Sequence, residues 1–499
     1  MDITTSGGRV IRIPPEILDH VFASSHYARD IDTVLCWSHV CRIWRVLALQ
    51  QYAYAQDVVW NYHKTKHWSH RLPDAAFLRH RLHVSAKPLE FDIFITDDDP
   101  AFVYDTLLPA LSRELHRVRT LRVSFARSAF PRVMRALVQP APVLRDLRLS
   151  LNASSGGTLV LAPPKDRLLL GGHAPLLVYL WLGGMELPAS STPAFSSLQH
   201  VSFEFSIGLK WRVPHNLLRL SPRPRHLSLS ISTVDMSALV PPAFPLSLES
   251  MSLLSDNKPV QLMSKLVSSK TPYIQCSVFR ASNSTLVVPY LLQQLPSGAL
   301  GVIFDFWSIS DGYVDLCVHH LESNLRRSVV FEGHWTPYTY RHTFPPALNA
   351  LITELTVEAN LFGVMAALFP SLPALHSLVL TGNMSLSDDD EDDVWPTGTE
   401  EQPPTLPTSH GSIQCGSLSK LVLAATTDLT EFLGVYSLVA FVEVALGQTG
   451  RAALELELRN VMLYGEASCL LGMFSRIVTV PHAGAFEQPD LRGERFRAY

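Results

Sequence analysis

The chain has 499 residues, enough for two to four ordinary domains or for one long repeat array. Its hydrophobic content of 47% can fill a large core, and its net charge of −4 gives no overall basic footprint for nucleic acid. Residues 1–13 lack the basic start and the apolar run of a secretory signal peptide.

The cysteines and the longest apolar stretch both indicate a soluble protein of the cytoplasm, the nucleus or both. The six cysteines have no paired spacing that would predict a disulfide framework or a zinc ribbon: Cys36, Cys41, Cys276, Cys317, Cys415 and Cys469. The stretch 432–446 includes Glu443 and is shorter than the ~20 residues that span a membrane, so it predicts a buried helix.

Two short runs near the amino terminus have the apolar spacing of helices. In residues 13–22 the apolar side chains fall on one helical face, and Pro14 and Pro15 stand where a proline is tolerated, in the first turn. In residues 38–47 a second stripe consists of Val40, Ile43, Trp44 and Leu47. With one turn of helix between them, at 32–37, these runs predict a small three-helix bundle.

These residues also resemble an F-box. The run Ile13-Pro14-Pro15-Glu16-Ile17-Leu18 through Val21-Phe22 is similar to the opening of that motif, and Val40-Cys41-Arg42-Ile43-Trp44-Arg45 to its close. The resemblance implies docking onto a Skp-type adaptor and, through it, onto a cullin–RING ubiquitin ligase. It implies that the adaptor-binding set is Pro14, Ile17, Leu18, Val21, Phe22, Leu35, Val40, Cys41 and Trp44. The alternative is an N-terminal helical cap packed within the chain.

Residues 61–95 are expected to form linker helices and a first strand. Leu89, Phe91, Ile93 and Ile95 alternate with Glu90, Asp92 and Phe94, as in a half-buried strand. Fungal F-box-like proteins have a similar segment here, so the resemblance extends to about residue 95.

From residue 96 to 480 an apolar-x-x-apolar-x-apolar pattern recurs, for example at Val118/Leu121/Val123, Leu177/Leu180/Leu182 and Leu375/Leu378/Leu380. Between residues 198 and 375 the copies lie roughly 23 to 27 residues apart, the period of leucine-rich repeats. The pattern predicts an irregular solenoid of strand plus helix or loop, and so a fold class of α + α/β solenoid. The alternative is an ordinary α/β domain whose strands have this spacing by coincidence.

The segment 385–415 interrupts the pattern with acidic residues and then with Pro, Thr and Gly, which predicts a disordered insert. Ser387, followed by three aspartates, resembles an acidophilic kinase site, whereas the plainer interpretation is a solvated acidic loop. Residues 1–11 are expected to be flexible, residues 12–60 to form the helical domain, and residues 481–499 to form a polar tail.

The sequence contains few candidate metal-binding or catalytic residues. His63, His67 and His70 share a helical face, but no second set of ligands lies nearby, so a solvent-exposed basic helix is favoured over a metal site. The set Cys36, His39 and Cys41 lies within the F-box-like segment, where Cys41 is expected in the helical core. No nucleophile elbow or other catalytic motif is present, and no cofactor or metal is expected.

The resemblance therefore favours a non-enzymatic substrate receptor of an SCF-type ubiquitin ligase, whose repeats bind an unknown protein target. Candidate target anchors are the aromatic side chains of Trp181, Trp211, Trp307 and Trp335, although packing in the core of the solenoid is the plainer interpretation of each. The first alternative is an interaction scaffold that binds the adaptor without a cullin, and the second is an enzyme on a repeat scaffold. No nucleic acid or membrane partner is expected.

Overall fold

The computed structural model describes the chain in segments, and every structural statement below concerns these residues. They are 2–4, 10–12, 14–24, 31–51, 56–60, 75–84, 87–97, 99, 101–152, 159–161, 168–186, 192–211, 224–234, 248–255, 259–266, 268–278, 281–308, 313–331, 344, 346–382, 406, 412–425, 431–447 and 454–480. They divide into two compact units, with residues 1–248 in unit 1 and residues 249–499 in unit 2.

Unit 1 begins with a short antiparallel pair, β1 (Asp2–Thr4) and β2 (Val10–Arg12). Three helices follow: α1 (Pro15–Ser24), α2 (Ile31–Ser38) and α3 (Arg42–Ala48). Pro15 is the first residue of α1, where its missing N–H costs no intrahelical bond. The extended backbone of Cys41 ends the turn after α2 and begins α3.

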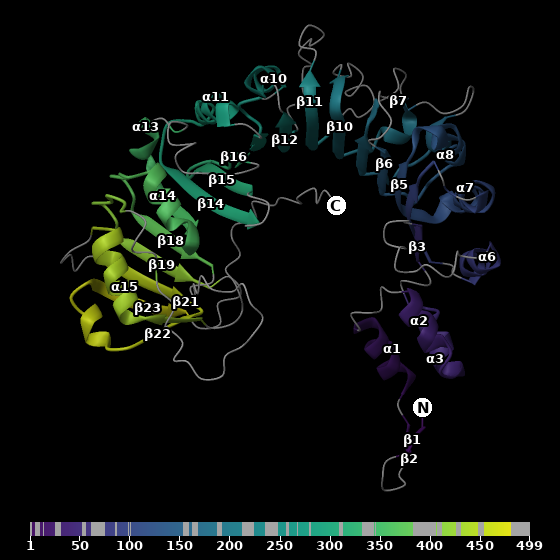
Figure 1. The fold of residues 1–499 in the computed structure, drawn as a ribbon, viewed down its shortest axis with the longest axis horizontal. Coiled ribbons are helices and arrows are strands. Elements are labelled where there is room, and N and C mark those ends of the chain that lie inside the picture. Colours follow the sequence, from purple (N-terminus) through teal and green to yellow (C-terminus); the bar gives the residue numbers. More distant parts are fainter. Residues whose placement is uncertain are drawn as a thin grey trace. The chain divides into compact units, whose positions relative to one another are not determined.

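The rest of unit 1 is built on a parallel sheet in which each strand lies beside the next. Its strands are β3 (Asp57–Trp60), β4 (Leu89–Ile95), β5 (Val118–Phe125), β6 (Asp146–Leu151), β8 (Tyr179–Gly183), β10 (His200–Trp211) and β11 (His226–Val234). A small separate pair is formed by β7 (Leu159–Val160) and β9 (Met185–Glu186). The helices α6 (Ala75–Val84), α7 (Leu108–Glu114) and α8 (Phe130–Ala136) lie along one side of these strands (Figure 1).

The strands of unit 1 are in a register that places apolar side chains in continuous buried rows. One row crosses six strands and consists of Phe91, Leu121, Leu147, Leu180, Val201 and Leu227. The next, two residues further along each strand, consists of Ile93, Val123, Leu149, Leu182, Phe203 and Leu229. Burial of each such side chain contributes about 1.5–3 kcal/mol, and a slip of one residue would expose a whole strand's set.

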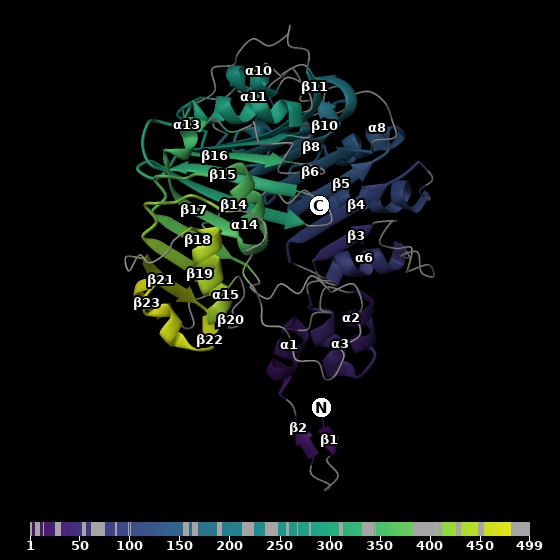
Figure 2. The ribbon, with the colours of Figure 1, turned by 60° about the vertical axis from the view of Figure 1, so that its left-hand side comes forward.

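In unit 2 the main-sheet strands do not follow chain order (Figure 2). In spatial order they are β12 (Ser250–Ser255), β13 (Tyr273–Val278), β16 (Arg326–Phe331), β15 (Tyr313–His320), β14 (Leu300–Ser308), β17 (Ile352–Glu358), β18 (Ser377–Thr381), β19 (Lys420–Ala424), β21 (Leu454–Arg459) and β23 (Phe474–Val480). Only β15 is antiparallel to its neighbours in this described sheet.

The remaining described α-helices and β-strands of unit 2 lie outside this sheet order. They are α10 (Pro259–Leu266), α11 (Ala281–Leu292), α13 (Pro346–Asn349), α14 (Phe362–Leu368), α15 (Val435–Ala440) and the parallel pair β20 (Glu431–Gly434) and β22 (Val461–Tyr464). The stretch predicted as one buried helix, 432–446, instead comprises most of β20, α15 and a π-helical turn, and it exposes Phe432.

In the sheet, β16 occupies the place beside β13 that β14 would have in chain order. A buried arginine holds it there. The guanidinium of Arg327 donates to the carbonyl oxygens of Ser269, Thr271 and Pro272, at 3.1, 3.0 and 3.3 Å. These carbonyls belong to the chain just before β13, so the contact fixes β16 against that strand. Burial lowers the pKa of Arg327 to about 10, which leaves it charged at neutral pH.

The predicted fold class, a three-helix F-box followed by an irregular leucine-rich-repeat solenoid, is wrong. The described chain is a mostly parallel α/β structure with seven main-sheet strands in unit 1 and ten in unit 2. The helical segment leads into β3, which already pairs with β4 in the sheet of unit 1. In unit 2, β13 pairs with β16 and β14 with β17, whereas a repeat array places each strand beside the next one along the chain.

We expect Asp57→Asn to stabilise the protein at neutral pH. Burial, followed by the carboxylates of Glu90 and Asp92, raises the pKa of Asp57 to about 6 from an ordinary value of 3.8. Ionised Asp57 therefore disfavours the folded state, and this cost vanishes below about pH 4 and is complete above about pH 6.

Thermal or urea unfolding at pH 7.5 and pH 4.0 measures the effect. The variant should gain about 1–2 kcal/mol at pH 7.5, allowing for the partial exposure of the carboxyl group, and almost nothing at pH 4.0. A loss of stability at pH 7.5 would contradict this account of Asp57.

Candidate protein-interaction surface

Phe22, near the end of α1, is the side chain around which the three N-terminal helices pack. Its ring stacks on Trp37 of α2, with centroids 4.6 Å and planes 9° apart. It also meets Trp44 of α3 edge to face, at 4.9 Å. Val34 and Ala48 form a second buried contact between α2 and α3. One buried ring therefore holds α1 against both other helices.

Polar contacts fix the same three helices. The amide nitrogen of Gln51 donates to the carboxylate of Asp19 at 3.0 Å and to the carbonyl oxygen of Leu47 at 3.2 Å, joining α1 to the end of α3. The Arg45 side chain donates to the carbonyl oxygen of Ser38 at 3.0 Å, joining α3 to the last residue of α2.

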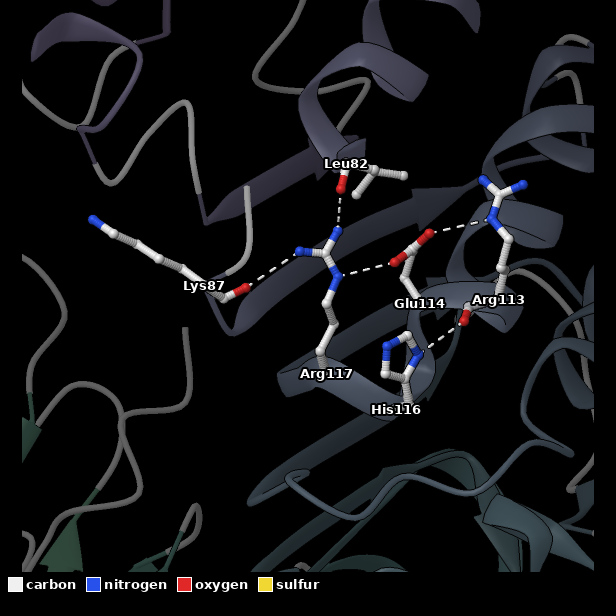
Figure 3. Close-up of polar contacts among 6 residues, drawn as sticks. All are labelled: Leu82, Lys87, Arg113, Glu114, His116 and Arg117. Carbon is white, nitrogen blue, oxygen red and sulfur yellow. Dashed lines mark hydrogen bonds and ion pairs between the residues drawn. The ribbon is translucent and has the colours of Figure 1, made fainter. Parts of the chain in front are cut away.

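A further chain of hydrogen bonds joins this helical region to the sheet of unit 1. Lys87 Nζ donates to the carbonyl oxygen of Gln50 at 3.2 Å, and the carbonyl oxygen of Lys87 accepts from Arg117 at 3.4 Å. Figure 3 shows that Arg117 also donates to the carbonyl oxygen of Leu82, at the end of α6, and pairs with Glu114 at 2.9 Å. Arg117 is thus the junction between α6, α7 and the segment that leads into β4.

The N-terminal helices expose several apolar side chains among charged and polar ones. Ile17 and Val21, one turn apart on α1, are 54% and 55% exposed. Val40, in the turn before α3, and Ile43 and Val46, within α3, are 52%, 44% and 57% exposed. We name these five side chains the apolar surface. Isolated exposed apolar residues are common on soluble proteins, but five on or beside two helices that contact each other favour a site of protein association.

The structure places the nine predicted adaptor-binding residues in three environments. Five are exposed: Pro14, Ile17, Val21, Val40 and Cys41. Two, Leu35 and Trp44, are half-buried, and two, Leu18 and Phe22, are buried within the helices and contribute packing instead of contact area. Cys41 is exposed, although the F-box pattern implies a core position.

Sequence reasoning missed Ile43 and Val46 as surface residues. Both continue from Val40 at the three-residue spacing of a helical stripe, so the signal was present in the pattern. Periodicity alone does not say which of two apolar faces on a short helix is turned inward.

The described residues contain no group of three or more His, Cys, Asp or Glu side chains that could hold a metal ion. Cys36 and Cys41 are free and exposed. Burial raises the pKa of Cys276 to about 12 and also raises the pKa of Cys317, so both thiols stay protonated at neutral pH and are poor nucleophiles.

Several sequence predictions fall outside the residues that the structure describes. They concern the histidines at 63, 67 and 70, the proposed kinase site at Ser387, and Trp335. Trp211 and Trp307 lie on described strands, but only the side chain of Trp181, half-buried on β8, can be placed. Among the described helices, none has both the length and the apolar character needed to cross a bilayer.

We expect Phe22→Ala to loosen the N-terminal helices strongly, because loss of a buried phenylalanine typically costs ~3–5 kcal/mol. Hydrogen exchange of the backbone amides in α1 measures the loss. Ile17→Ala, on the same helix but exposed, is the matched control and should leave exchange nearly unchanged. Equal protection in the two variants would show that Phe22 does not hold the helices together.

No protein-family model matches the chain, and a search of curated proteins finds no match. The assignment of a function therefore rests on the residues of the chain and on the geometry described above.

Proposed function

We propose that the chain is a substrate receptor of an SCF-type ubiquitin ligase and that its N-terminal helices dock onto a Skp-type adaptor. The F-box-like sequence pattern of residues 13–45 supports the choice of partner. The apolar surface supports the mode of binding, because its five side chains gain about 25 cal/mol for each Å² that a partner removes from water.

The observation that carries the proposal is that α1 has two sets of apolar side chains, one buried and one exposed. Leu18 and Phe22 are buried and hold the helices together, whereas Ile17 and Val21 face outward at the same helical spacing. A cap packed within the chain would cover both stripes. They are neighbours, about 100° apart on the helix, so α1 has one broad apolar face, of which part packs on its own chain and part stays exposed for a partner.

The protein's own contribution would be non-catalytic. The adaptor would link it to a cullin, and a ubiquitin-charged enzyme would perform the chemistry while this chain holds a target lysine nearby at high effective concentration. The function would be carried out in the cytoplasm, the nucleus or both. The target-binding part would be the remainder of the chain, beginning with the sheet of unit 1.

We expect the double variant Ile17→Asp/Val21→Asp to lose adaptor binding while keeping its fold, because each change buries a charge in an apolar interface without removing a core side chain. The measurement is capture of a purified Skp-type adaptor by the full chain, followed by capture of a cullin. The matched control is Leu168→Asp/Leu176→Asp, two apolar residues that are also exposed in unit 1.

Adaptor capture that is lost in the first variant and kept in the control supports docking, and added cullin capture supports the ligase role. Capture of the adaptor without cullin would instead identify an interaction scaffold. If the wild-type chain captures no adaptor, the proposed function is wrong.

A further inference from the structure

The short parallel pair β20 and β22 of unit 2 exposes apolar side chains on one of its faces. Phe432 and Met462 are direct partners in the register of this pair, and both are exposed. Two residues further along, exposed Tyr464 lies beside Gly434, where an added Cβ would come within 3.3 Å of the tyrosine hydroxyl oxygen. Leu433, between the exposed positions, is buried, as the alternation of side chains along a strand requires.

Tyr436 extends this exposed group onto α15, which adjoins β20 and β22 (Figure 2). Its side chain is exposed. The Oγ atom of its neighbour Ser437 lies 3.8 Å from the same Cβ position at Gly434 that faces the Tyr464 hydroxyl group, so the start of α15 lies next to the exposed face. We name four side chains the aromatic patch: Phe432, Tyr436, Met462 and Tyr464.

The side chains of the aromatic patch are of the kinds that protein interfaces favour. Phenylalanine, tyrosine and methionine are all enriched where proteins contact one another. Aromatic rings supply a large contact area with few rotatable bonds, and the flexible thioether of Met462 adapts to an irregular partner. Four such side chains on three adjoining elements therefore favour a docking site over isolated exposed residues.

The charged residues in the two segments that form the aromatic patch are all glutamates. Residues 431–447 and 460–473 contain Glu431, Glu443 and Glu466 and neither lysine nor arginine. Glu443 lies in the π-helical turn after α15, and Glu466 lies two residues after the end of β22. Both of these side chains are exposed. The patch is therefore bordered by negative charge.

The cations of the neighbouring main-sheet strands already have carboxylate partners. Arg459 of β21 and Lys420 of β19 both pair with Glu457, at 2.5 and 2.7 Å. Arg476 of β23 lies 3.9 Å from Glu455. These cations are therefore engaged within the sheet and do not cancel the glutamates beside the aromatic patch.

The formal charge stays negative when these strands and the segments between them are counted. Residues 420–480 have four Lys and Arg against six Asp and Glu, a charge of −2. Unit 2 as a whole has 14 Lys and Arg against 26 Asp and Glu, a charge of −12. A basic partner is attracted to such a surface from a distance, and the attraction weakens as salt rises.

This charge selects among the possible occupants of the aromatic patch. A second copy of the chain, docked through the same patch, would bring Glu443 and Glu466 against their own counterparts, and like charges across an interface disfavour association. A nucleic acid or an anionic membrane surface would be repelled in the same way. A basic protein segment instead pairs its cations with these glutamates while its apolar side chains cover the rings.

We propose that the aromatic patch binds a short basic segment of a partner protein. Lysine or arginine side chains of the segment lie beside Glu443 and Glu466, and its apolar side chains pack on Phe432 and Met462. The inference rests on the proposed function only in treating that segment as part of a target; binding itself is tested without the adaptor.

The probe is a fluorescein-labelled fourteen-residue peptide of leucine and lysine, with its leucines on one helical face, titrated with the full chain and followed by fluorescence anisotropy. Phe432→Gln/Met462→Gln removes apolar area without changing charge and should weaken binding at least about tenfold, which is about 1.4 kcal/mol. The matched control is Leu286→Gln/Leu351→Gln, at two apolar positions of unit 2 that are also exposed, and it should change affinity less than about twofold.

A second pair of variants tests the charge. Glu443→Gln/Glu466→Gln should weaken binding in low salt, and the difference from wild type should shrink in high salt. Its control, Glu322→Gln/Glu354→Gln, makes the same charge change at two other exposed glutamates of unit 2 and should have the smaller effect. Thermal melting confirms that each variant is folded.

Absence of saturable peptide binding would overturn the inference, and so would equal losses in a patch variant and its control. Equally tight binding of a leucine–glutamate peptide would contradict the choice of a basic partner. A dimer in sedimentation that Phe432→Gln/Met462→Gln dissociates would identify the patch as a contact between copies and overturn the inference. Adaptor capture with peptide binding absent would refute only this inference, whereas peptide binding with adaptor capture absent would refute only the proposed function.

Discussion

The alternation of buried and open side chains along parallel strands is the constraint on which unit 1 depends. Each buried row is shared by six strands, so the register of any one strand is fixed by its neighbours on both sides. The same register aligns the residues that point the other way. The stacked pair His200 and His226 and the adjacent Arg122 and Arg148 are thus consequences of core packing, although none of them belongs to the core.

The N-terminal helices depend on fewer contacts than the sheet does. A segment of about thirty-five residues cannot bury much surface by itself, and here a single phenylalanine between two tryptophans supplies most of the described aromatic packing. The hydrogen bond from Lys87 to Gln50, and the contacts of Arg117 behind it, attach the helices to the sheet of unit 1. Ile17 and Val21 stay outside this core because Leu18 and Phe22 already fill it.

Local patterns in the sequence predicted many strands but not how they pair. Leu89–Ile95 forms the strand that alternation indicated, and sets such as Val118/Leu121/Val123 and Leu375/Leu378/Leu380 fall on or lead into β5 and β18. Strand order is a long-range property. The exchange of β14 and β16 depends on the contacts of Arg327 with backbone carbonyls more than fifty residues earlier, which no local period reveals. For the same reason periodicity identified the apolar helices but did not separate Phe22 from Val21.

The apolar surface of unit 1 and the aromatic patch of unit 2 have different physical requirements, and this difference bears on the proposed function. An apolar surface is stabilised by removal from water, and salts such as sulfate strengthen this effect. A patch bordered by carboxylates also attracts a basic partner electrostatically, and this part of its affinity falls as salt rises. Under the proposed function, the first kind of surface keeps the chain on its adaptor, and the second lets successive targets bind and leave.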